Sequence, residues 1–156
     1  SLLNMFYIHE LIDVAIELNI DPDKVNVNNL LTTPDFYDVR LLPDYLKKEL
    51  IDKITDYRDN IVPPHFKFVV EYGLKSWKEF INQPFTGDRE QAEMQLLKNT
   101  VYLDNSRDED FLEVNPQYQK WFQEIRSKIK DPQKFFTKVG TRKVMKYKPS
   151  KKQALI

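Results

Sequence analysis

The residue types that this chain lacks limit the chemistry it can do. It contains no cysteine and only two histidines, His9 and His65. Without thiolates it has no thiol nucleophile, no disulfide, no zinc–thiolate site and no ligand for an iron–sulfur cluster. Two histidines are too few for a metal site built from imidazoles. We therefore expect that this chain by itself has no catalytic residue and binds no metal ion or cofactor.

Acidic residues gather in one segment, "DNSRDEDFLE". Its carboxylates belong to Asp104, Asp108, Glu109, Asp110 and Glu113. The segment lacks the alternating oxygen ligands and the central glycine of an EF-hand calcium loop. We expect a solvated connector in which Arg107 pairs with a neighbouring acid. His9 and Glu10 have no third ligand or nucleophile beside them, so they are interpreted as a surface pair.

Basic residues gather after residue 129. Residues 130–156 contain nine Lys or Arg and one acid, whereas residues 1–129 contain 15 basic and 23 acidic residues. The residues that could contact a nucleic-acid backbone are Arg142, Lys143, Lys146 and Lys148, with Tyr147 as a stacking face. No nucleic-acid-binding motif accompanies them. Docking on the acidic body and a solubilising end are the other interpretations, and nucleic-acid binding is the minor one.

Helical periodicity dominates the elements that must position these residues. About five helices are expected, within residues 4–18, 43–61, 62–83, 88–107 and 115–129. The best formed begins at "LPDYLKKELIDKI", with Pro43 and Asp44 in its first turn. Gly73, in the third helix, predicts close packing or a bend. The expected core residues are Leu46, Leu50, Ile54, Phe66, Val70, Trp77, Leu97, Val101 and Trp121.

One segment alternates instead. "VNVNNLL", Val25 to Leu31, predicts a strand with Asn26 and Asn28 on the same face. "VRLL", residues 39–42, is either a short second strand or an extended approach to Pro43. A lone strand exposes unpaired backbone groups, so it needs a partner in residues 39–42, in the tail or in a second subunit. The expected fold is mostly α, with one or two short β-strands. Residues 1–129 form its globular domain, and residues 130–156 a basic tail that is partly ordered or mobile.

No apolar run is long enough to cross a bilayer, and the first residues lack the basic and apolar regions of a signal peptide. A cytoplasmic location is therefore the expectation, with no membrane contact.

Two stretches resemble a known family. The first runs from "HELIDVAIELNI" through "VNVNNLLTTPDFYDV" to "LPDYLKKELIDKI", and the second is "LKNTVYLDNSRDEDFLEVNPQYQKWFQEI". Together they are similar to the C-terminal portion of radical S-adenosylmethionine proteins with a twitch-type C-terminal region, over most of residues 4–127. The resemblance implies the C-terminal end of a partial α/β barrel. In such a barrel Asn26 and Asn28 could hydrogen-bond a cofactor or substrate, although solvated asparagines are the favoured interpretation.

The chain departs from that family where the chemistry occurs. The family holds its [4Fe–4S] cluster with a CxxxCxxC loop, and this chain has no cysteine. If the resemblance holds, the chain is a non-catalytic, substrate-side part. S-adenosylmethionine and the [4Fe–4S] cluster would then belong to a separate catalytic half, which becomes a candidate partner.

Three functions remain open from the sequence. The first is this C-terminal part of a radical S-adenosylmethionine protein, the second a standalone helical interaction module, and the third a nucleic-acid accessory protein acting through its tail. An unpaired strand edge and apolar helix faces need cover. A homodimer is therefore expected, with residues 25–31 or the first helix, Met5 to Leu18, at its two-fold interface.

Overall fold

A computed structural model describes residues 2–27, 30, 32–131 and 135. The chain divides into two compact units, residues 1–92 and residues 93–156, and each has its own packing. The expected domain of residues 1–129 includes unit 1 and most of the described part of unit 2.

Every regular element of the described residues is helical, and no strand occurs among these residues. The α-helices are α1 (Ile8–Glu17), α2 (Asp44–Asp56), α3 (Lys67–Ile81), α4 (Arg89–Arg107), α5 (Phe111–Val114) and α6 (Gln119–Ser127). Short 3-10 turns are η1 (Leu2–Tyr7), η2 (Pro22–Lys24), η3 (Asp35–Tyr37), η4 (Val39–Leu41), η6 (Pro64–Phe66) and η7 (Pro116–Tyr118). A π turn, η5 (Tyr57–Ile61), extends α2. The mostly helical expectation is confirmed.

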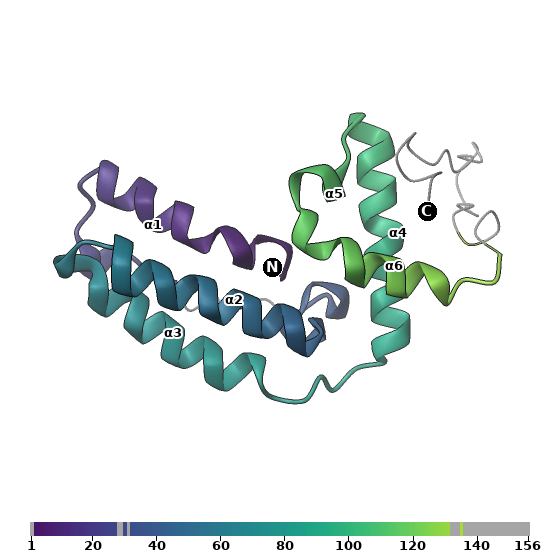
Figure 1. Ribbon diagram of the computed structural model, residues 1–156, viewed down its shortest axis with the longest axis horizontal. Coiled ribbons are helices and arrows are strands. Elements are labelled where there is room, and N and C mark those ends of the chain that lie inside the picture. The colour runs from purple at the N-terminus through teal and green to yellow at the C-terminus, as the bar shows by residue number, and fades with distance from the viewer. Residues whose placement is uncertain (1, 28–29, 31, 132–134, 136–156) are drawn as a thin grey trace. The chain divides into compact units, whose positions relative to one another are not determined.

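Unit 1 is built from α1, α2 and α3, which Figure 1 shows running alongside one another in purple, blue and teal. Leu46, Leu50 and Ile54 of α2 lie at four-residue spacing and are all buried. They face the buried side of α3, which includes Val70, Leu74 and Trp77. The hydrophobic core of unit 1 therefore includes the interface between α2 and α3.

The predicted strand at Val25 to Leu31 is wrong over its described residues. Val25 has extended backbone angles, but no neighbouring strand pairs with this segment in the described part of the chain. Val27 is buried against α3 instead, and the Trp77 indole N–H donates a hydrogen bond to its carbonyl oxygen at 3.0 Å. The apolar alternation thus reflects one anchored valine in a loop.

Gly73 allows that anchor to form. A Cβ atom built on Gly73 would lie 2.7 Å from Cγ2 of Val27 and 3.1 Å from the Trp77 ring. Close packing, one of the two roles expected for Gly73, is therefore the one the structure shows. The possible second strand, residues 39–42, is also wrong, because Val39 to Leu41 form η4 with the Asp38 side chain at its N-cap.

Unit 2 contains an aromatic core. Its rings belong to Phe111, Tyr118, Trp121 and Phe122, whose neighbouring centroids lie 5.6 to 6.4 Å apart. Glu93 on α4 is buried and accepts a hydrogen bond from the Lys128 ammonium at 2.7 Å, which ties α4 to the end of α6. All nine expected core residues of the two units are buried.

No helix of the described residues is long and apolar enough to cross a membrane.

Candidate functional site

Helix α1 has one apolar face turned into unit 1 and another turned to solvent. Ile12 and Ala15 are buried. Leu11, Val14 and Leu18 follow one another at three- and four-residue spacing, so they form a single stripe on the helix surface. Their exposed fractions are 56%, 47% and 67%. A row of three large, exposed aliphatic side chains is typical of a surface that contacts another molecule.

A fourth exposed aliphatic residue follows the C-terminal end of α1. Asn19 adopts a left-handed conformation with φ of 54°. The N–H of Ile20 donates to the Ala15 carbonyl and that of Asn19 to the Ile16 carbonyl, the two hydrogen bonds of a Schellman motif. The motif turns the chain back at the helix end and leaves Ile20 38% exposed. We call Leu11, Val14, Leu18 and Ile20 the outer face of α1.

An acidic edge borders the outer face. Glu10 lies four residues before Val14 and Glu17 three residues after it, so both are neighbours of Val14 on the helix surface. Both are exposed, and neither forms an ion pair with any residue that the structure describes. Residues 1–23 contain five acidic residues and no Lys or Arg. The outer face therefore has negatively charged side chains along one edge.

Polar contacts on another side of α1 fix its position. The Tyr57 hydroxyl donates a hydrogen bond to the Asp13 carboxylate at 2.6 Å, and the His9 ring packs edge-on against the Tyr57 ring. Burial, followed by the hydrogen bond to Asp13, raises the pKa of Tyr57 well above its usual value. Burial and the Lys53 ammonium lower the pKa of His9. Both groups thus stay neutral at neutral pH, and this cluster holds α1 against the end of α2.

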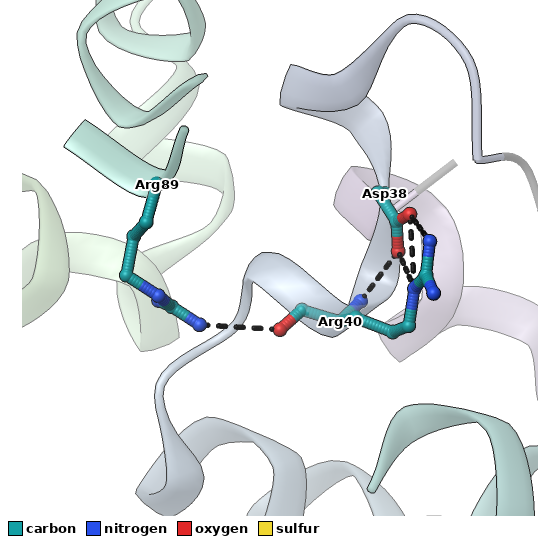
Figure 2. Close-up of polar contacts among 3 residues, drawn as sticks. All are labelled: Asp38, Arg40 and Arg89. Atoms are coloured by element: carbon teal, nitrogen blue, oxygen red, sulfur yellow. Dashed lines mark hydrogen bonds and ion pairs between the residues drawn. The ribbon is translucent and has the colours of Figure 1, made fainter. Parts of the chain in front are cut away.

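A second polar cluster joins η4 to the first turn of α4 (Figure 2). The buried Asp38 carboxylate accepts hydrogen bonds from the backbone N–H, Nε and Nη2 of Arg40, at 2.6 to 3.1 Å. Arg40 also lies over the Phe80 ring. Arg89 donates from Nη1 to the Leu41 carbonyl at 2.7 Å and from Nη2 to the Arg40 carbonyl at 3.3 Å. The side chains of Asp38, Arg40 and Arg89 make these hydrogen bonds within the cluster, so we interpret the cluster as structural.

The acidic connector in unit 2 agrees with part of its prediction. Arg107 and Glu109 form an ion pair at 3.9 Å, as expected. Asp104 differs, because it is half-buried and accepts a hydrogen bond from the Phe111 N–H at 3.1 Å. Burial raises its pKa to about 6, with help from the charges of Asp110 and Glu109. The part of the chain that the structure describes contains no group of three potential metal ligands.

The other residues singled out in the sequence do not converge. Asn26 is exposed, and its predicted partner on the strand face, Asn28, lies outside the described residues. The predicted nucleic-acid contacts, Arg142, Lys143, Lys146 and Lys148, also lie outside them. His9 is half-buried against Tyr57, while Glu10 is exposed, so the two do not form the expected surface pair.

Comparison with known proteins gives no relative: no family model, curated protein sequence or solved structure matches this chain.

Proposed function

We propose that this chain is a helical protein-interaction module and that the outer face of α1 is its contact surface. The observation that carries the proposal is the exposure of Leu11, Val14 and Leu18 in one row. Each Å² of aliphatic surface that binding removes from water stabilises the complex by roughly 25 cal/mol. A partner that packs against this row gains that contribution, while the helix is already held in place by its inner face and by Tyr57.

The row is suited to a helical partner. Residues at three- and four-residue spacing are the anchors through which amphipathic helices bind one another. The Tyr57 to Asp13 hydrogen bond and the Schellman motif hold α1 in shape before binding. Such preorganisation reduces the entropic cost of association.

Site-specific photocrosslinking tests this proposal. A photoreactive amino acid placed at Val14 in the full chain should give discrete crosslinked products in the cells that express it. The substitutions Leu11→Gln and Leu18→Gln should remove these products, because glutamine keeps the helix but not the apolar row. The matched control carries the photoreactive residue at Glu49, an exposed position on α2.

The two positions must behave differently. Products at position 14 that equal those at position 49, or that survive Leu11→Gln with Leu18→Gln, would contradict the proposal. The mass of the main product also shows whether the partner is a second copy, as in the homodimer expected from the sequence, or another protein.

A further inference from the structure

We infer that the partner of the outer face of α1 is an amphipathic helix of another protein whose apolar row is bordered by lysines or arginines. This inference rests on the proposed function and adds the chemistry of the partner.

The charges beside the row carry the inference. Glu10 and Glu17 flank Val14 on the same side of α1, are exposed and have no ion-pair partner in the described part of the chain. Any helix that packs on Leu11, Val14 and Leu18 places its own border residues near these two carboxylates. Opposite charges there accelerate association and favour one partner over another, whereas like charges repel.

The same geometry disfavours a symmetric pair of α1 helices. In an antiparallel pair, a two-fold axis places each edge of one helix against the same edge of the other. Glu10 and Glu17 of one copy would therefore face the acidic edge of the second copy. The segment that carries this edge supplies no compensating charge, because residues 1–23 contain no Lys or Arg.

Two synthetic peptides distinguish the kinds of partner. Both have leucines at three- and four-residue spacing, and the border positions are lysine in one and glutamate in the other. Fluorescence anisotropy with the full chain should show that the lysine-bordered peptide binds at least about tenfold more tightly at low salt, since two or more ion pairs separate the peptides. Added salt should narrow this difference, because it screens exposed charges.

Two variants assign the effect to α1. Glu10→Gln with Glu17→Gln should weaken binding of the lysine-bordered peptide by roughly fivefold and reduce its salt dependence. The matched control, Glu49→Gln with Glu79→Gln, removes two exposed carboxylates from α2 and α3 and should leave binding unchanged. Leu11→Gln with Leu18→Gln should abolish binding, and circular dichroism should confirm that every variant keeps its helices.

Equal affinity for the two peptides would overturn the inference, and so would equal losses in the Glu10/Glu17 and Glu49/Glu79 variants. A dimer that Leu11→Gln with Leu18→Gln converts to monomer would also overturn it, because the occupant would then be a second copy. These results leave the proposed function intact if crosslinks form at position 14. The absence of those crosslinks is the separate result that removes the proposed function itself.

Discussion

At the scale of single residues, Asp104 links a local environment to pH. Its pKa is raised to about 6 from an ordinary 3.8, chiefly by burial. Because the folded state holds this proton more tightly than the unfolded state, Asp104 supports folding most at low pH. That contribution to the free energy of unfolding is lost as the pH rises from about 4 to about 6.

The variant Asp104→Asn should therefore be more stable than the parent at pH 7, by about 1 kcal/mol once solvent screening is allowed for. At about pH 3, below both pKa values, the two should be equally stable, because asparagine is neutral and keeps an oxygen acceptor for the Phe111 N–H. Urea unfolding at both pH values measures this. The control Asp108→Asn removes an exposed charge from the same connector. A stability difference that is the same at both pH values would contradict the assignment.

Gly73 marks the closest contact between the loop at Val27 and α3. In Gly73→Ala the added methyl group would lie 2.7 Å from Cγ2 of Val27, whose carbonyl is hydrogen-bonded to Trp77. Overpacking of this kind costs about 1–3 kcal/mol, partly offset by the better helix propensity of alanine. We expect Gly73→Ala to lower the free energy of unfolding by about 1–2 kcal/mol, as measured by thermal or urea unfolding.

A double mutant isolates the clash. In a Val27→Ala background the facing methyl group is gone, so Gly73→Ala should cost nothing or stabilise the chain. Equal costs in the two backgrounds would show that Val27 and Gly73 are not coupled.

At the scale of elements, Trp121 anchors the aromatic core of unit 2. It is 2% exposed and packs edge-on against Phe122. Trp121→Ala should lower the free energy of unfolding by about 3–5 kcal/mol, because a large buried ring leaves a cavity. The control Tyr102→Ala removes a partly exposed ring from α4 and should cost less than about 1 kcal/mol in the same urea titration.

Helices were predictable from the sequence where their apolar row is narrow. In α2, Leu46, Leu50 and Ile54 repeat every four residues and are separated mainly by charged residues, and that pattern specifies both the helix and its buried side. Helix α1 was also predicted, but it is apolar around more than half of its circumference. Its periodicity therefore could not tell that Leu11 and Leu18 are exposed while Ile12 is buried.

The predictions that failed depend on contacts distant in the sequence. The alternation around Val27 resembled a strand because Gly73 and Trp77, nearly fifty residues later, bury one valine of a loop. Asp104 resembled a solvated acid because its burial and its hydrogen bond depend on how α5 folds back. Asn115 lies at the N-cap position of η7, but its side-chain amide donates to the Phe111 carbonyl and makes no cap hydrogen bond.

At the scale of the whole molecule, the resemblance to radical S-adenosylmethionine proteins stays a prediction. It predicts that this chain is a C-terminal part whose cluster-binding half is a separate segment. The chain has no cysteine to ligate a cluster. Anaerobic reconstitution with iron and sulfide should therefore give no stoichiometric [4Fe–4S] cluster, as iron analysis and visible absorption would show. A stoichiometric cluster would contradict the ligand argument.

The guanidinium of Arg89 has a consequence for how unit 1 opens. Arg89 is hydrogen-bonded to the carbonyl oxygen of Leu41, 48 residues earlier in the chain, and to that of Arg40, 49 residues earlier. The segment between these residues contains α2 and α3. While these bonds hold, the ends of that segment cannot separate, so partial fraying of either helix gains little chain entropy. Amide hydrogen exchange in α2 and α3 should then proceed through one shared opening rather than two independent ones. We therefore expect Arg89 to couple the two helices into a single cooperative unit.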